Sequence, residues 1–282
     1  GDLAWAAGDS QARGFLIGAT AGRTTLNGEG LQHQDGHSHI LANTIPNCRT
    51  YDPTYGFELA VIIQDGLKRM FEQQENCFYY ITTMNENYKH PEMPVGVEQD
   101  IIKGMYLLKE GKKNKKKDLR VQLMGAGSIL REVEAAAKLL KKDFSVESDI
   151  WSLTSVNELT REGQKTQRHN LLNPEAEAQK AFITQQLEGR QGPVIGATDY
   201  MKSYLEQLRA YVPGRFSVLG TDGFGRSDTR KKLRRFFEVD RHFIVLASLK
   251  ALADEGKLEL SVVSQAMTKY GISADKIDPL MC

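Results

Sequence analysis

The sequence is poor in cysteine, in long apolar runs and in net charge, and each shortage excludes a class of protein. Its three cysteines, Cys48, Cys77 and Cys282, lie far apart without a CxxC pair, which indicates reduced cytoplasmic thiols and not a zinc ribbon or redox motif. No apolar run approaches the roughly 20 residues that a membrane-spanning helix needs. The net charge of +1 provides no field that would attract nucleic acid or an anionic membrane. We therefore expect a cytoplasmic protein that selects its partners through specific sites.

The first residues also lack the features of a targeting segment. Gly1-Asp2-Leu3-Ala4-Trp5 contains no initiator Met, no basic stretch and no continuous apolar core, so a signal peptide is not expected. A start on Gly1 inside a predicted helix leads us to expect a fragment or a processed chain.

The order of apolar patterns along the chain predicts an α/β fold with two domains. A chain of 282 residues exceeds what one hydrophobic core usually fills. Short β-branched or apolar runs alternate with helical stripes, which predicts a mostly parallel sheet flanked by helices in each domain. Strands are expected at 15–18, 48–51, 77–83, 119–124, 149–153, 193–197 and 216–219. Helices are expected at 3–13, 57–70, 129–140, 199–211, 228–237, 240–254 and 261–270.

The segment from Glu110 to Asp118 is rich in lysine and contains no apolar residue. We interpret it as a solvated linker, with one domain at 1–110, the linker at 111–117 and a second domain at 118–282. A basic run could instead bind phosphates or an acidic partner, but no aromatic residue is interleaved to stack on bases. The linker interpretation is therefore preferred.

The most unusual chemistry lies in a long loop, residues 20–37, which is rich in Gly, Thr, Asn and Gln. Three of the six histidines fall at its end or just beyond it, beside the acidic residues Glu29 and Asp35. These histidines are His33, His37 and His39. Imidazole groups are costly to bury without partners, so the cluster suggests proton transfer, hydrogen bonding to a polar ligand, or metal ligation. Long loops in compact domains are often functional.

A zinc site at this cluster requires side chains that converge on one point. If residues 37–39 are extended, His37 and His39 share a face. No Cys lies nearby, and no second histidine or carboxylate pair follows at helical spacing to complete a tetrahedron. A substrate or cofactor site is therefore preferred over a metal site or a purely structural cluster, and we assign no metal ligand.

Two glycine-rich turns have ordinary structural interpretations. Gly125-Ala126-Gly127 follows a predicted strand, but Leu130 stands where a dinucleotide fingerprint has its third glycine, so we predict a tight strand-to-helix turn. The segment 222–228 is also predicted to be a turn, with Ser227 or Asp228 capping the following helix. The basic residues of that helix are expected to form its solvated face. They are Lys231, Lys232, Arg234 and Arg235.

At the histidine segment the sequence resembles a known family. Leu26-Asn27-Gly28-Glu29-Gly30-Leu31-Gln32-His33-Gln34-Asp35-Gly36-His37-Ser38-His39 closely resembles a stretch of the homodimeric bacterial pyruvate dehydrogenase component. Residues 1–9, 79–88 and 221–228 resemble the same family. The resemblance extends over essentially the whole chain, and the histidine segment is long enough to be specific.

Members of this family are transketolase-like homodimers that hold thiamine diphosphate and Mg²⁺ between two subunits. The resemblance implies that 1–110 is the later part of a pyrimidine-binding domain and that 118–282 is the C-terminal domain. The sequence contains no Gly-Asp-Gly motif with a following Asn, which holds Mg²⁺ and the diphosphate in the family. The resemblance therefore implies that this fragment alone binds no cofactor and is inactive.

The resemblance also implies a reaction and a partner. The family decarboxylates pyruvate and reductively acetylates the lipoyl group of dihydrolipoyl acetyltransferase. His33 resembles the active-site histidine that hydrogen-bonds the substrate, Glu29 resembles its acidic neighbour, and His39 resembles a histidine of the related transketolase loop. Two alternatives remain open, namely a non-catalytic interaction or regulatory module and a zinc hydrolase that uses His33, His37 and His39.

Overall fold

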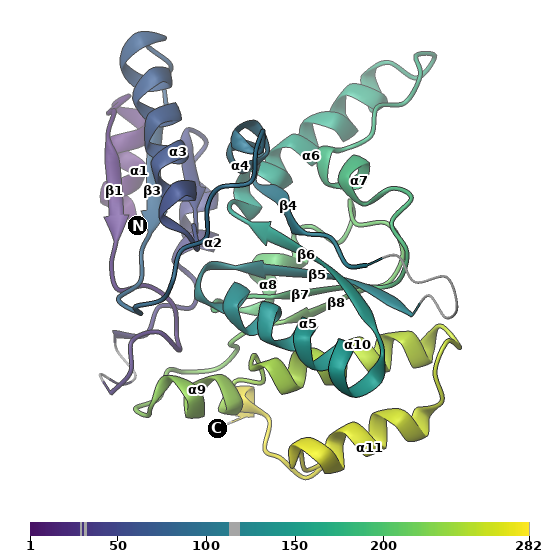
Figure 1. Ribbon diagram of the computed structural model, residues 1–282. Coiled ribbons are helices and arrows are strands. Elements are labelled where there is room, and N and C mark those ends of the chain that lie inside the picture. Colours follow the sequence, from purple (N-terminus) through teal and green to yellow (C-terminus); the bar gives the residue numbers. More distant parts are fainter. Residues whose placement is uncertain (29, 31–32, 113–118, 282) are drawn as a thin grey trace.

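The computed structural model describes residues 1–28, 30, 33–112 and 119–281. Within these residues the strands form two sheets, which lie side by side and are each flanked by helices (Figure 1). The first sheet has the strand order β1-β3-β2, and the second sheet has the order β4-β6-β5-β7-β8. The predicted α/β class, with a mostly parallel sheet in each part, is confirmed.

The first sheet is parallel throughout. Its strands are β1 (Phe15–Gly18), β2 (Cys48–Tyr51) and β3 (Phe78–Thr82). The associated helices are α1 (Asp2–Asp9), α2 (Ser38–Asn43) and α3 (Gly56–Leu67), which continues into a π-helical turn (Lys68–Glu72). Ile62 of α3 packs with Tyr79 and Ile81 of the central strand β3, and all three side chains are fully buried. This packing fixes α3 against the sheet.

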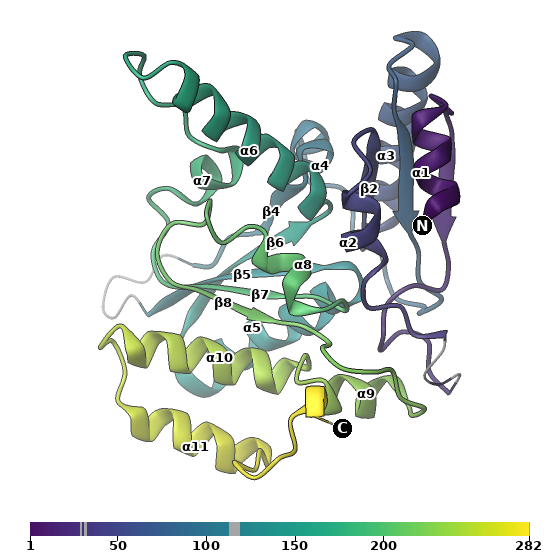
Figure 2. The ribbon, with the colours of Figure 1, turned by 180° about the vertical axis from the view of Figure 1, so that it is seen from behind.

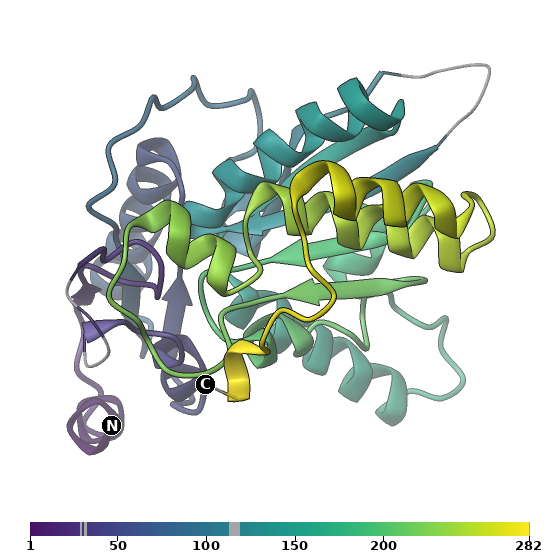
Figure 3. The ribbon, with the colours of Figure 1, turned by 90° about the horizontal axis from the view of Figure 1, so that it is seen from below.

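The second sheet is parallel except for the edge strand β4, which pairs antiparallel with β6. Its strands are β4 (Met105–Lys109), β5 (Arg120–Ala126), β6 (Glu147–Leu153), β7 (Val194–Ala197) and β8 (Phe216–Leu219). One apolar core contains α5 (Leu130–Phe144), α10 (Arg241–Asp254) and α11 (Leu260–Tyr270). Another contains α6 (Val156–Leu172), α7 (Phe182–Leu187) and α8 (Lys202–Glu206). Helices therefore cover both faces of the sheet (Figure 2, Figure 3).

The change from the first sheet to the second occurs earlier than the predicted linker at 111–117. Strand β4 already pairs with β6, with Met105 opposite Leu153, so it belongs to the second sheet. The short helix α4 (Glu98–Lys103) precedes it and ends at Gly104, whose positive φ of 113° turns the chain into the strand. Most of the lysine-rich segment lies outside the described residues. Strand pairing thus places the change of sheet between β3 and β4.

A buried polar contact joins the two sheets. Glu58 of α3 is fully buried, and its carboxylate accepts hydrogen bonds from Tyr106 Oη of β4 and Ser152 Oγ of β6, both at 2.7 Å. The backbone amides of Thr54 and Tyr55 also donate to it, at 2.5 and 2.9 Å. Burial raises the pKa of Glu58, while these four donors favour the charged form. The junction therefore contains specific hydrogen bonds as well as apolar packing.

Several elements have no counterpart among the predicted ones. Helix α6 is the largest of them, and its N-cap Ser155 accepts a hydrogen bond from Glu158 N at 3.0 Å. The helices α2, α4 and α7 and the strand β4 are also absent from the predicted set, and α8 is shorter than the predicted helix at 199–211. Among the described residues, none of the helices combines the length and the apolar character needed to cross a bilayer.

Candidate active-site loop at the junction of the two sheets

The loop 20–37, called the histidine loop below, begins just after the carboxyl end of β1, and its described residues contact segments that follow strands of both sheets. Ala21 N donates to Thr83 O beyond β3 at 3.0 Å, and Met201 N, beyond β7, donates to Gly36 O at 2.9 Å. Ligands in parallel α/β folds bind at the carboxyl ends of strands. The structure therefore places the loop where strand ends of both sheets meet, which is the expected position for a functional site.

The three histidines differ in environment. His33 and His37 are exposed, whereas His39 is fully buried on α2. The Asp35 carboxylate accepts hydrogen bonds from His37 N at 3.0 Å and Ser38 N at 2.9 Å, and these bonds turn the chain into α2. The extended conformation that a zinc site would require of residues 37–39 is therefore wrong. The part of the chain that the structure describes contains no group of three or more His, Cys, Asp or Glu side chains that could hold a metal ion.

The residue after His33, Gln34, contacts the loop 222–228, which follows strand β8 of the second sheet. The Gln34 side chain donates to Leu26 O at 3.1 Å and to Arg226 O at 2.5 Å, and it accepts from Arg226 N at 2.7 Å. Gly28 N also donates to Asp228 O, at 3.1 Å. The backbone around His33 is thus attached to the second sheet while the ring itself is exposed. Glu29, the other candidate in this loop, lies outside the described residues.

His39 is enclosed by three tyrosines and makes one polar contact. Its ring lies 5.2, 4.9 and 5.1 Å from the rings of Tyr80, Tyr200 and Tyr204. Its Nε2 is 2.8 Å from Thr82 Oγ1, and its Nδ1 has no hydrogen-bond partner among the described residues. Burial lowers the pKa of His39 to about 4. The ring is therefore neutral at neutral pH and presents no atom to solvent.

The contact of His39 continues to a buried carboxyl group. Thr82 Oγ1 donates to Asp52 Oδ1 at 2.7 Å, so Thr82 bridges His39 and Asp52. Burial raises the pKa of Asp52 to about 7, and Asp52 Oδ2 accepts no hydrogen bond from the residues that the structure describes. A Cβ atom on Gly127 would lie 2.4 Å from this oxygen, so the absence of a side chain there allows the close approach. Sequence reasoning missed Asp52, although an acid directly after a parallel strand is a recognisable signal.

The two glycine turns behave partly as predicted. Residues 125–127 end β5 and lead through a 3-10 turn (Gly127–Ile129) into α5, in agreement with a strand-to-helix turn. The cap of α9 (Arg230–Phe236) is Thr229 and not Ser227 or Asp228, because Thr229 Oγ1 accepts from Lys232 N. The solvated face predicted for this helix is wrong for Arg234, which is buried.

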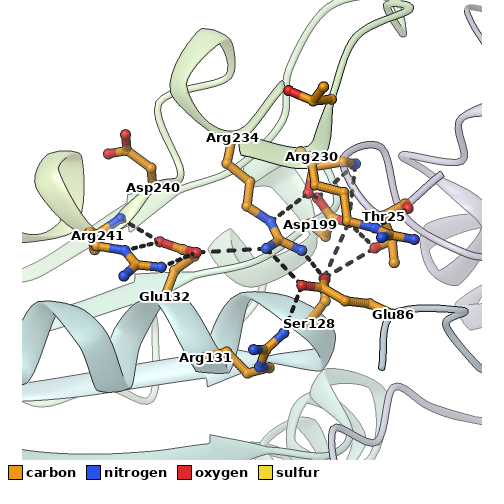
Figure 4. Close-up of polar contacts among 12 residues, drawn as sticks. Thr25, Glu86, Ser128, Arg131, Glu132, Asp199, Arg230, Arg234, Asp240 and Arg241 are labelled. Atoms are coloured by element: carbon orange, nitrogen blue, oxygen red, sulfur yellow. Dashed lines mark hydrogen bonds and ion pairs between the residues drawn. The ribbon is translucent and has the colours of Figure 1, made fainter. Parts of the chain in front are cut away.

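Arg234 lies at the centre of a buried ionic network (Figure 4). It pairs with Glu86, beyond β3, and with Glu132 of α5 at 3.6 Å. Arg131 also pairs with Glu86, at 2.6 Å, and Arg241 pairs with Glu132 at 2.8 Å. Burial opposes ionisation of both acids, but the arginines outweigh it and hold the pKa values of Glu86 and Glu132 below their usual range. The network ties the segment after β3 to three helices of the second sheet.

Comparison with solved structures defines the class of fold. Transketolase from Campylobacter jejuni matches 88% of this chain and 33% of its own with a TM-score of 0.64 and 20% identity. Transketolase from Leishmania mexicana matches 90% of this chain and 32% of its own with a TM-score of 0.61 and 15% identity. The fold is therefore transketolase-like.

Sequence comparison defines the family. Residues 1–91 match the model of the pyruvate dehydrogenase E1 component middle domain, and residues 104–240 match the transketolase-like C-terminal domain. The pyruvate dehydrogenase E1 component of Pseudomonas aeruginosa is 63% identical over 100% of this chain, and that of Escherichia coli K12 is 56% identical over 99%. The chain belongs to the pyruvate dehydrogenase E1 component family. It covers 32% and 31% of the length of these two relatives.

Proposed function

We propose that the full-length protein is the thiamine-diphosphate-dependent E1 component of a pyruvate dehydrogenase complex. It decarboxylates pyruvate and reductively acetylates the lipoyl group of dihydrolipoyl acetyltransferase, as a homodimer in the cytoplasm. The observation that supports this proposal is the 52–63% identity of essentially the whole chain to proteins named pyruvate dehydrogenase E1 component. Two family models that match separate parts of the chain add to it.

The proposal gives the histidines different roles. His33 is exposed beside the junction, so its imidazole can donate or accept a proton at an oxygen of a bound substrate. Glu29 is proposed to orient that site. His39 is enclosed by tyrosines and exposes no atom, so its part in the reaction is to fix the start of α2 below the loop and not to touch the substrate.

The described residues form no metal site of their own with three or more ligating side chains. Mg²⁺ in such sites takes carboxylate oxygens together with phosphate oxygens. Within residues 1–28, 30, 33–112 and 119–281 no three acidic or imidazole side chains converge on one point. Since the chain covers about a third of the length of its relatives, we propose that thiamine diphosphate and Mg²⁺ are held mainly by other parts of the full-length protein.

The proposed activity is tested with the full-length protein. We expect pyruvate-dependent release of carbon dioxide and acetylation of an added lipoyl domain, both requiring thiamine diphosphate and Mg²⁺. The measurement is mass spectrometry of the lipoyl domain together with carbon dioxide release, with 2-oxoglutarate as the control substrate. Decarboxylation of 2-oxoglutarate with pyruvate left unchanged would contradict the proposed substrate.

A second prediction concerns the chain of 282 residues by itself. We expect it to bind no thiamine diphosphate, with or without Mg²⁺, because it covers about a third of its relatives and its described residues contain no group of three or more His, Cys, Asp or Glu side chains for the ion. Isothermal titration calorimetry at millimolar ligand measures this, and the full-length protein is the positive control. Micromolar binding by the chain alone would show that the cofactor ligands lie within it.

A further inference from the structure

A single buried acid of the second sheet holds the first part of the histidine loop. Asp199 lies just after β7 and is almost fully buried. Its carboxylate accepts hydrogen bonds from Thr24 N at 3.1 and 3.2 Å, from Thr24 Oγ1 at 2.7 Å and from Thr25 Oγ1 at 2.8 Å. Its carbonyl oxygen accepts another from Arg23 N at 3.2 Å. Three consecutive loop residues are therefore bonded to one residue of the other sheet.

The backbone of the loop is shaped for this close approach. Gly22 has a φ of 87°, and a Cβ atom on it would lie 2.2 Å from Asp199 Oδ2. A residue with a side chain there would be strained and would also push the carboxylate away. The loop thus combines a glycine that admits the carboxylate with two threonines that bond to it.

The charge of Asp199 is balanced through the loop itself. Arg234 Nε donates to Thr24 Oγ1 at 3.2 Å, and this hydroxyl donates to Asp199, so Thr24 bridges the cation and the anion. Burial raises the pKa of Asp199, while Arg234 and the threonine donors favour its charged form. Arg230 adds a bond from its Nε to Thr25 O at 2.8 Å. The loop therefore belongs to the buried network, because its Thr24 hydroxyl connects Arg234 with Asp199.

The contacts on both sides of His33 come from the second sheet. Asp199 holds Thr24 and Thr25 before it, and Arg226 holds Gln34 after it. We infer that Asp199 is a positioning residue for His33, so that the second domain takes part in catalysis by fixing the histidine loop. This inference rests on the proposed function, because it assumes that His33 meets the substrate.

The test uses four variants of the full-length protein. Asp199→Asn removes the charge, and Thr25→Val removes one hydroxyl with little change of shape. Thr25→Ser keeps the hydroxyl and is the rescue variant. Thr166→Val is the matched control, since Thr166 is a buried threonine of α6 whose hydroxyl donates to Glu162, with no hydrogen bond to the loop recorded among the described residues. Pyruvate turnover and amide hydrogen exchange of residues 20–37 are measured for each variant.

We expect Asp199→Asn and Thr25→Val to lower kcat by about 10- to 100-fold with little change in the KM for pyruvate, because a small displacement of a reacting group has this effect. Exchange of the loop amides should become faster in both. Thr25→Ser should behave as the wild type, and Thr166→Val should change neither readout.

Two results would overturn the inference. One is wild-type exchange of the loop in both Asp199→Asn and Thr25→Val. The other is faster exchange of the loop in Asp199→Asn and Thr25→Val with an unchanged kcat, provided that His33→Ala lowers turnover. If His33→Ala itself keeps wild-type turnover, the proposed role of His33 fails, and the exchange data still decide whether Asp199 holds the loop.

Discussion

Replacing His33 by alanine in the full-length protein is expected to lower pyruvate turnover by about two to four orders of magnitude, because it removes a general acid or hydrogen-bond donor. The ring is exposed and its neighbour Gln34 makes the structural contacts of this segment, so folding should not change. Steady-state kinetics measures the loss. Calorimetry with thiamine diphosphate should give nearly the wild-type affinity.

Two further variants make this experiment specific. His33→Gln retains a hydrogen-bond donor but transfers no proton, so turnover between that of the wild type and that of His33→Ala would indicate hydrogen bonding in addition to proton transfer. His169→Ala is the matched control, because this histidine lies on α6 and bonds only to Asn173 among the described residues. Full activity in His33→Ala would end the assignment of this residue.

The pair Asp52 and His39 should give the protein an unusual dependence of stability on pH. Burial raises the pKa of Asp52 from 3.8 to about 7, so the folded state binds the extra proton and loses stability as pH rises through this range. Asn does not titrate. The free energy of unfolding of Asp52→Asn, relative to the wild type, should therefore increase by about 3 kcal/mol between pH 4 and pH 7, from 1.36 kcal/mol per unit of pKa difference. Urea denaturation across this range measures the difference.

His39 supplies a control of opposite sign. Burial lowers its pKa from 6.5 to about 4, so its contribution to stability is complete above pH 6.5 and is lost as pH falls toward 4. The variant His39→Gln, compared with the wild type, should gain about 3 kcal/mol on acidification over this interval. Other titrating groups cancel in both comparisons. A pH-independent difference in either variant would contradict the burial of that group.

Most strands could be predicted from the sequence, because a strand is recognised from the side chains of a few consecutive residues. Residues 15–18 and 216–219 are short, mostly apolar runs, and they match β1 and β8 at both ends. The predicted strand at 48–51 also matches β2 at both ends. Helix α6 escaped prediction because its 17 residues are mostly polar and form only a narrow apolar stripe. Strand β4 escaped because a single antiparallel edge strand departs from the alternation of strand and helix.

The site is only partly visible in the sequence for a related reason. The histidines are neighbours along the chain, so their clustering is apparent from the order of the residues alone. The groups that hold them are not neighbours, since Asp52 and Thr82 are 30 residues apart and Thr24 and Asp199 are 175 apart. Arg234 is a second example. Its helix carries four basic residues and was expected to be solvated, because its acidic partners Glu86 and Glu132 are distant in the sequence.

The separation of the loop from its supports also affects the order of folding during synthesis. Thr24 emerges from the ribosome 210 residues before Arg234. At about 5 to 20 residues per second, the loop spends roughly 10 to 40 s without the groups that fix it. We therefore expect the contacts that hold Thr24 and Thr25 to be complete only after helix α9 has been made, although both residues lie near the start of this chain.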